Sequence, residues 1–159
     1  MITTERLALL PLQVEYAVPM AEVLSDPALY TFTGGEPPTV EALGARYRRQ
    51  LAGPDREGEQ WLNWIVRYDD NLIGYVQATV TGSTAEIAWV IGTAWQGRGF
   101  AKEAAQGLVT WLRAGNAHRI IAHVHPEHTA SAAVAAAIGL ACTDVLEDGE
   151  YLWSTADPA

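Results

Sequence analysis

Hydrophobic residues along the chain follow two periods, one of two positions and one of three to four. Alternating or short apolar stretches bounded by turn residues predict strands at 6–12, 60–68, 72–80, 84–91, 120–125, 140–146 and 150–154. Helical spacing predicts helices at 14–24, 40–51, 97–114 and 131–138. In the second of these strands, Leu62, Trp64 and Val66 share one face opposite polar positions, which predicts a strand buried on one side only.

Length and composition indicate one soluble domain. The chain has 159 residues, of which 49% are hydrophobic and 18% charged, a balance typical of a single folded domain over residues 1–159. Together with the element order, this predicts an α/β (α+β) fold with a mixed, mostly antiparallel sheet of six or seven strands and about four flanking helices. The apolar runs are too short for a membrane span, and the N-terminus lacks the features of a secretory signal. Cys142 is the only cysteine, so we expect a cytoplasmic protein.

The charge balance is strongly acidic. Ten Lys and Arg against nineteen Asp and Glu give a net charge of −9. This charge would repel nucleic acid and anionic membranes, so neither is expected as a partner. A polyanionic ligand would need a local positive site, and Lys102, the only lysine, lies with Arg98 in the stretch WQGRGFAKEAA at the head of a predicted helix.

This stretch has the chemistry of an anion-binding helix N-terminus. Backbone N–H groups at the start of a helix have no partner within the helix, and the helix dipole adds partial positive charge. Gly97 and Gly99 allow sharp turns and the close approach of a ligand. A Walker A loop has four residues between its glycines, followed by Lys-Ser/Thr, and this stretch does not have that spacing. A dinucleotide-binding loop does not fit either, because position 102 is lysine instead of glycine and the preceding strand belongs to an antiparallel meander.

The same stretch resembles a known family motif. Residues 96–101 read Gln-x-x-Gly-x-Ala and resemble the acetyl-CoA pyrophosphate loop of the GNAT superfamily of N-acetyltransferases. Residues 85–104 look like that loop and its preceding strand in the RimJ/RimL branch, which acetylates protein N-termini and related amines. Residues 118–140 and 4–12 look like the next strand and helix and the opening strand of that branch, so the likeness covers roughly half of the chain in the expected order.

The resemblance implies a GNAT-like fold, acetyl-CoA as co-substrate and no metal. The diphosphate would rest on the backbone N–H groups of residues 97–102, and the pantetheine arm would pair like an added strand with residues 89–91. The strands that follow Leu72 and His118 would diverge to admit it. The residues that the resemblance implies in cofactor binding are Trp89, Val90, Ile91, Gln96, Gly97, Arg98, Gly99, Phe100, Ala101, Lys102 and His128.

Several positions depart from the family's pattern. His128 stands where an asparagine often contacts the pantetheine arm, although its ring can also donate a hydrogen bond. Ala135 stands where a tyrosine often serves as general acid, so that proton donor is missing. Leu10 replaces a frequent arginine in the opening strand. Ser131, three residues after His128, is equally suited to be a catalytic hydroxyl or the N-cap of the alanine-rich helix.

Acetyl transfer requires a neutral amine, and an amine with a pKa of about 10 is mostly protonated at neutral pH. Glu86 is the candidate base, because its strand runs into the cofactor site and its carboxylate could draw the proton off through water. Two alternatives for Glu86 are an exposed strand residue and an ion-pair partner for an arginine. A backbone N–H near Val90 or Ile91 would polarise the thioester oxygen, and the placement of the two reactants would supply much of the rate.

The expected partners are acetyl-CoA and a primary amine, either a protein N-terminus or a small molecule. Tyr30, Phe32 and Tyr47 are aromatic candidates for lining the acceptor pocket, beside a Gly- and Pro-rich loop at 33–39. The acidic composition favours a cationic acceptor. The sequence allows a homodimer without determining the oligomeric state.

Two other functions are compatible with parts of the sequence. His123, His125 and His128 nearly match the His-x-His-x-Asp-His pattern of zinc-dependent metallo-β-lactamase-like hydrolases, although only 31 residues follow and they hold no further histidine. The second is a non-catalytic module that binds acyl-CoA as a sensor, since the phosphate loop matches better than the residues that handle protons. The leading prediction is an acyltransferase that moves an acetyl group from acetyl-CoA to a primary amine.

Overall fold

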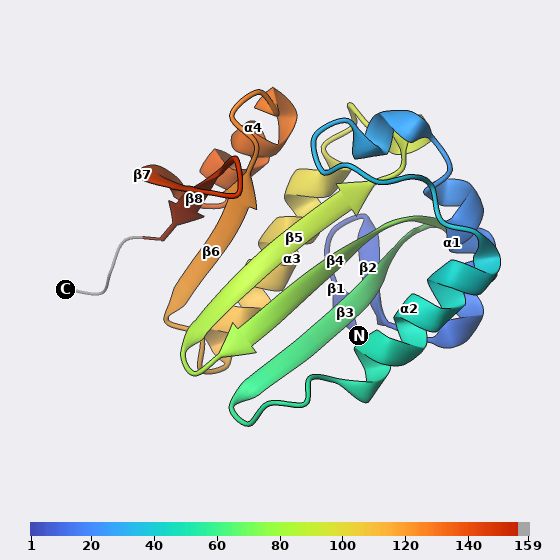
Figure 1. The fold of residues 1–159 in the computed structure, drawn as a ribbon, viewed down its shortest axis with the longest axis horizontal. Helices are drawn as coiled ribbons and strands as arrows, with labels where there is room; N and C mark the ends of the chain where they lie inside the picture. Colours follow the sequence, from blue (N-terminus) through green and yellow to red (C-terminus); the bar gives the residue numbers. More distant parts are fainter. Residues whose placement is uncertain (156–159) are drawn as a thin grey trace.

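The computed structural model describes residues 1–155, which form one sheet with helices on both faces (Figure 1). Its strands are β1 (Ile2–Thr3), β2 (Leu7–Pro11), β3 (Glu59–Tyr68), β4 (Asn71–Thr81), β5 (Thr84–Ile91), β6 (Arg119–Val124), β7 (Ala141–Glu147) and β8 (Glu150–Ser154). Its α-helices are α1 (Ala17–Val23), α2 (Val40–Ala52), α3 (Phe100–Ala114) and α4 (Thr129–Ala137). Short 3-10 helices are η1 (Val14–Tyr16), η2 (Pro27–Tyr30) and η3 (Thr93–Trp95). The predicted α/β (α+β) fold is confirmed.

The sheet is mixed and mostly antiparallel, as predicted. The strand order is β1-β2-β3-β4-β5-β6-β8-β7, and β5–β6 is the parallel pair, joined by the crossover helix α3. Residues 1–155 contain eight strands, so the predicted count of six or seven is too low. The strand that was missed, β1, pairs only Ile2 and Thr3 with β2, and two residues are too few to show an alternating pattern.

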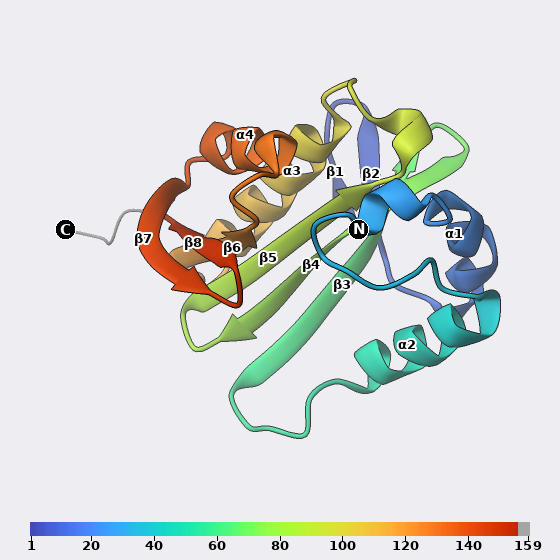
Figure 2. The same cartoon turned by 45° about the horizontal axis from the view of Figure 1, so that its top comes forward.

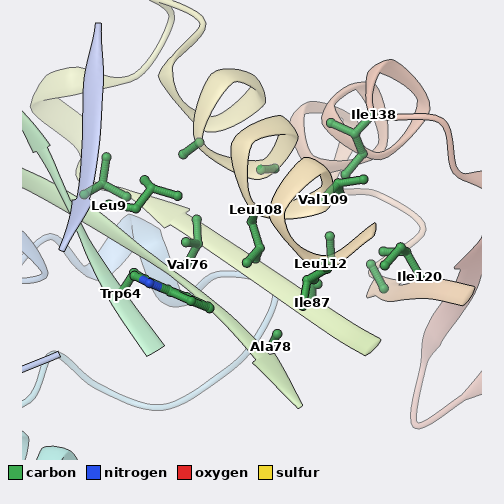
Figure 3. Packing of buried hydrophobic residues seen from close by; sticks show 14 of the residues in the cluster. Leu9, Trp64, Val76, Ala78, Ile87, Leu108, Val109, Leu112, Ile120 and Ile138 are labelled. Carbon is green, nitrogen blue, oxygen red and sulfur yellow. The ribbon is translucent and has the colours of Figure 1, made fainter. Parts of the chain in front are cut away.

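Both faces of the sheet are covered. Helix α3 packs its apolar side, including Leu108, against one face (Figure 3), whereas α1 and α2 lie over β3 and β4 on the other (Figure 1). Trp64, Ile65 and Val66 are therefore all buried, so the prediction of a strand buried on one side only is wrong at the centre of β3. The sequence pattern shows only one apolar face there because Ile65 lies between the polar residues Asn63 and Arg67 on the second face.

Strands β5 and β6 separate along their length. Their pairing covers residues 84–86 of β5, and from residue 87 to residue 91 that edge of β5 has no strand partner among residues 1–155. Figure 1 shows the two strands closest at the start of β5 and farther apart toward its end. The prediction named the strand after Leu72 as one of the diverging pair. This is wrong, because that strand is β4, which pairs with every residue of β5.

Helix boundaries differ from the predictions for local reasons. The helix predicted at 14–24 is η1 followed by α1, because a start at Ala17 places Pro19 in the first turn, where its missing N–H is not needed. Helix α3 begins at Phe100 rather than at Gly97, because Gly97 and Gly99 have φ values of 79° and 80°.

None of the described helices has the length and apolar character needed to cross a bilayer.

Candidate active site

The loop between β5 and α3 presents a continuous row of free backbone donors. The N–H groups of residues 97–102 have no hydrogen-bond acceptor within residues 1–155, and the next N–H, that of Glu103, donates to the Gly99 carbonyl at 3.1 Å. The 15-residue helix α3 adds the positive end of its dipole at the same place. Such a terminus suits an anion with several oxygens, because the donors converge without a side chain between them and the ligand.

Two glycines and one amide side chain shape this loop. Gly97 and Gly99 are left-handed, a conformation that other residues adopt at a cost. A Cβ added at Gly97 would meet no atom within 4 Å, so the need for glycine there is conformational, whereas one at Gly99 would lie 3.4 Å from Nη2 of Arg6. Gln96 donates from Nε2 to the Ile91 carbonyl at 2.9 Å, so its side chain ties the loop to the end of β5.

A carboxylate on α3 fastens the loop to the N-terminal segment. Glu103 accepts hydrogen bonds from Oγ1 of Thr4 and, at 2.7 Å each, from the backbone N–H and Nε of Arg6. Arg6 also donates from Nη1 to the Arg98 carbonyl at 3.0 Å. Partial burial raises the pKa of Glu103, but the hydrogen bonds from Thr4 and Arg6 outweigh it and hold the pKa below its usual value. Sequence reasoning missed this group, which we call the Glu103 clamp, because Arg6 and Glu103 are 97 positions apart.

The two cations of the loop have different environments. The Arg98 guanidinium lies 5.2 Å from the Tyr68 ring centroid and 4.9 Å from that of Phe100, so aromatic faces hold it. Lys102 is exposed, and Ala101 is half-buried. The side chain of Phe100 is 1% exposed and belongs to the core, so it is not available to a ligand. Only the backbone N–H of Phe100 can make the predicted contact with the cofactor.

The three residues predicted to contact pantetheine lie on the separated part of β5. Trp89, Val90 and Ile91 pair with β4 on one side, and their other backbone edge faces the gap between β5 and β6. Ile91 is buried and the other two are half-buried. The backbone edge rather than the side chains is therefore what this segment offers, which suits an extended ligand arm that pairs as an added strand.

Glu86 lies in contact with a histidine on the neighbouring strand. Its Oε1 is 2.5 Å from Nδ1 of His123, and Nε2 of the same ring is 3.2 Å from Oε2 of Glu147. The side chains come from β5, β6 and β7 and form a carboxylate–imidazole–carboxylate chain. Within residues 1–155 the partner of Glu86 is therefore His123 and not an arginine, which the sequence did not reveal because the parallel register of β5 and β6 is set by the tertiary fold.

His128 caps helix α4. Its Nδ1 accepts a hydrogen bond from the N–H of Ser131 at 3.2 Å, and its Nε2 lies 3.1 Å from Oγ of Ser131. The alternative of Ser131 as the N-cap is therefore wrong, since Ser131 is inside the first turn. Burial, and after it the charge of His125, lower the pKa of His128, which favours the neutral ring that an accepting Nδ1 requires. Ala135, at the position of the missing tyrosine, is fully buried.

The segment between η2 and α2 contacts the turn that joins β6 to α4. Phe32 stacks on His128 with ring centroids 4.6 Å apart and contacts His125 with centroids 5.1 Å apart. Figure 2 shows this segment crossing the sheet face that also carries α1 and α2. One of the aromatic candidates for the acceptor pocket therefore lies directly against a residue predicted to bind the cofactor.

The three histidines of the alternative zinc site do not converge. His123 is held between two glutamates, whereas His125 and His128 lie against Phe32. Within residues 1–155, no group of three or more His, Cys, Asp or Glu side chains is arranged to hold a metal ion. The geometry does not support a zinc hydrolase.

The free N–H groups of residues 97–102 lie just after β5, and one backbone edge of β5 has no strand partner at residues 87–91. This arrangement is expected of a protein that binds an acyl-CoA. A family profile described as the acetyltransferase (GNAT) domain matches residues 6–141. The chain belongs to the GNAT acetyltransferase family. The predictions of a GNAT fold and of an acetyl-CoA-dependent acyltransferase are thereby confirmed at the level of the family, whereas the acceptor and the roles of individual residues are not.

Individual proteins show the same relationship. An uncharacterised N-acetyltransferase, p20 of Bacillus licheniformis, is 30% identical over 133 residues, which cover 80% of this chain and 75% of that protein. Another, YnaD of Bacillus subtilis (strain 168), is 38% identical over 79 residues, which cover 48% of this chain and 46% of that protein, so the match spans less than half of YnaD. The solved structure of RimL, a ribosomal L7/L12 α-N-protein acetyltransferase in complex with coenzyme A, has a TM-score of 0.81 and 16% identity, covering 97% of this chain and 96% of that chain.

Proposed function

We propose that the protein transfers an acetyl group from acetyl-CoA to a primary amine, as a member of a RimJ/RimL-like branch of the family. The observation that carries the proposal is the row of acceptor-free N–H groups at residues 97–102 beside the open edge of β5. Family membership supports acetyl-CoA as the co-substrate. The likeness in fold to RimL, which is named as an α-N-protein acetyltransferase, supports an amine as the acceptor.

The residues present fit a CoA ester along its length. The six N–H groups of residues 97–102 would hold the diphosphate, with Lys102 adding charge from the helix surface. The free edge of β5 at residues 89–91 would hydrogen-bond the pantetheine arm and place a backbone N–H near the thioester oxygen. His128 lies across the gap on the β6 side and would contact the same arm.

Glu86 is proposed as the group that accepts the amine proton, directly or through a water molecule. The acceptor nitrogen bonds to the thioester carbon, the carbon–sulfur bond breaks, and the nitrogen loses a proton that Glu86 takes up. His123 contacts Glu86 at 2.5 Å and so fixes the direction of its carboxylate. The contact of His123 with Glu147, whose side chain is 60% exposed, offers the proton a path to solvent.

Ser131 is proposed to donate a hydrogen bond to the departing thiolate, in place of the missing tyrosine, while the proton that the thiolate takes up comes from solvent. Because Nδ1 of His128 accepts from the Ser131 N–H, a neutral His128 ring carries its proton on Nε2. Nε2–H then donates to Oγ of Ser131, 3.1 Å away. The hydroxyl proton of Ser131 is thereby left free to point at the thiolate that leaves when the carbon–sulfur bond breaks.

The setting of this activity is also inferred. We expect residues 1–159 to act as one domain in the cytoplasm, with acetyl-CoA and an amine as partners and with neither nucleic acid nor a membrane surface. A net charge of −9 and a single, unpaired cysteine, Cys142, support these expectations. A homodimer stays a prediction.

The test combines binding and turnover. Thiol release from acetyl-CoA is measured over a panel of primary amines, and coenzyme A binding is measured by calorimetry. We expect micromolar to millimolar binding and thiol release that depends on the acceptor, on the order of 1 to 1,000 turnovers per second with a good acceptor. Binding without thiol release for any amine would instead favour the non-catalytic sensor, and no binding would contradict both.

A further inference from the structure

A cavity lies on the face of the sheet that α1 and α2 cover. It has a volume of about 170 Å³ and lies between α2 and the strands β3 and β4, on the face opposite α3. Its polar lining side chains are Arg46, Tyr47, Gln50, Asn63, Tyr75 and Gln77. Pockets that hold drug-sized ligands usually exceed about 300 Å³, so this cavity suits only a small molecule or one end of a larger one.

The Tyr47 hydroxyl is a buried donor without a partner. Tyr47 lines the cavity and is 4% exposed, and its Oη has no hydrogen-bond partner within the described residues. Burial, and next the neighbouring Tyr75, raise the pKa of Tyr47 far above its usual value, so the group is a neutral hydroxyl at any working pH. A buried hydroxyl left unpaired is unfavourable, so a ligand oxygen in the cavity is its natural acceptor.

Arg46 is the one charged side chain among the residues that line the cavity. It forms no ion pair with any carboxylate of residues 1–155. Arg46, Tyr47 and Tyr75 line the same cavity. Burial raises the pKa of Tyr75, and the positive charge of Arg46 partly offsets that rise. The charge of Arg46 acts in the same direction on Tyr47.

This set of groups recognises a carboxylate. A guanidinium offers paired N–H donors in the geometry of a carboxylate, and the phenol and amide side chains supply further donors. The lining holds no Asp or Glu, so it offers no carboxylate to pair with a second ammonium group. The acidic composition of the whole chain favours a cationic acceptor, whereas the cavity itself is positively charged and favours an anionic group.

The cavity lies beside the proposed site of transfer. Its β4 residues Tyr75 and Gln77 are paired with Val90 and Ala88 of β5, the strand that borders the gap. Neighbouring strands are about 4.8 Å apart, so β4 lies two strand spacings, or roughly 10 Å, from a thioester held as an added strand at the free edge of β5. An amine that attacks the thioester from the cavity side lies somewhat closer to the cavity than this.

We infer that the acceptor is a primary amine that also carries a carboxylate, roughly 5 to 10 Å from the amine, such as an ω-amino acid or a dipeptide. Arg46 and Tyr47 bind the carboxylate, and the amine reaches the thioester past Val90. This inference rests on the proposed function and names the substrate class of the same site.

The test compares each acid with its own amide. Rates of thiol release are measured for 6-aminohexanoate against 6-aminohexanamide, and for glycylglycine against glycylglycinamide. A charged hydrogen-bonded pair predicts that kcat/KM of the wild type is roughly 10- to 100-fold higher for the acids. Arg46→Ala removes this preference through KM with acetyl-CoA binding unchanged, while Arg49→Ala, an exposed arginine on the same helix outside the cavity, keeps it.

A second variant separates ligand binding from structure. Tyr47→Phe removes a hydroxyl that has no partner in the protein, so it leaves the free energy of unfolding unchanged or higher, yet raises KM for the acids severalfold. Equal rates for acids and amides, or an Arg46→Ala variant that keeps the preference, would overturn the inference while leaving the acetyltransferase intact. A matched aminoalkylphosphonate that outperforms both acids would overturn the carboxylate assignment. No thiol release with any amine, charged or neutral, would mean that the proposed function itself has failed.

Discussion

The two halves of the proposed active site are built in different ways. The cofactor half rests mainly on one contiguous stretch, residues 87–102, which offers backbone groups at the free edge of β5 and at the start of α3, with His128 added from the start of α4. The acceptor half is assembled from α2, β3 and β4 and offers side chains. A site that binds its ligand through backbone groups needs glycines at fixed spacing, and this pattern is visible in the sequence. A site that binds its ligand through side chains from separate elements has no such local pattern. The comparison explains why the cofactor can be named from sequence and the acceptor cannot.

The largest effect is expected in the cofactor half. Gly99→Glu places a side chain and a negative charge where a diphosphate would rest, and forces a left-handed residue to carry a Cβ. We expect the Kd for coenzyme A to rise more than about 100-fold, measured by calorimetry. Gly149→Glu is the control, because Gly149 has the same φ of 80° in the exposed turn between β7 and β8 and lies far from the loop in sequence. An unchanged Kd for Gly99→Glu would remove the loop from the site.

The next effect is expected at Glu86, the last residue of β5 that pairs with β6 before the free edge begins. Glu86→Gln keeps the size of the side chain but cannot accept a proton, so we expect kcat to fall about 100-fold at neutral pH. The loss should shrink as the pH rises toward the pKa of the amine, because the acceptor then arrives already neutral. Glu41→Gln, an exposed change on α2, serves as the control. A pH-rate profile identical to that of the wild type would show that Glu86 is not the base.

A smaller effect is expected at the β6–α4 turn. Ser131→Ala removes the proposed donor to the thiolate, and we expect kcat to fall about tenfold while KM for acetyl-CoA stays the same. Thr129→Ala removes a hydroxyl from the same turn of α4 and should have no effect. A change in KM alone would mean that Ser131 only helps to bind the cofactor.

The smallest effect concerns the stability of the cofactor half. Glu103→Gln weakens three hydrogen bonds of the Glu103 clamp and should lower the free energy of unfolding by about 1 to 2 kcal/mol at pH 7. Because the pKa of Glu103 is lower in the folded state, its contribution is present above the unfolded pKa and is lost as pH falls through the folded value. Urea unfolding from pH 7 to pH 3 should show the wild type and the variant converging. A difference that persists unchanged at pH 3 would contradict this origin.

The sequence predicted the elements better than it predicted their contacts. The strands of the meander and helix α3 were visible because apolar periodicity and turn residues are local features. The Glu103 clamp and the contact between Glu86 and His123 were not, since each joins segments that the fold brings together. Ser131 was open between two roles, and the start of α4 at Thr129, capped by His128, excludes the N-cap. Arg46 was not singled out at all, because an exposed arginine on an amphipathic helix looks the same whether or not a cavity lies beneath it.

The claim on which the account depends is that backbone N–H groups between Gly97 and Lys102 bind the diphosphate of the co-substrate. Amide ¹⁵N–¹H shifts followed during titration with coenzyme A, and separately with pantetheine, test it residue by residue. We expect large shifts at residues 97–102 with coenzyme A and none there with pantetheine, which has no diphosphate. Coenzyme A binding that leaves these six amides unmoved would contradict the account.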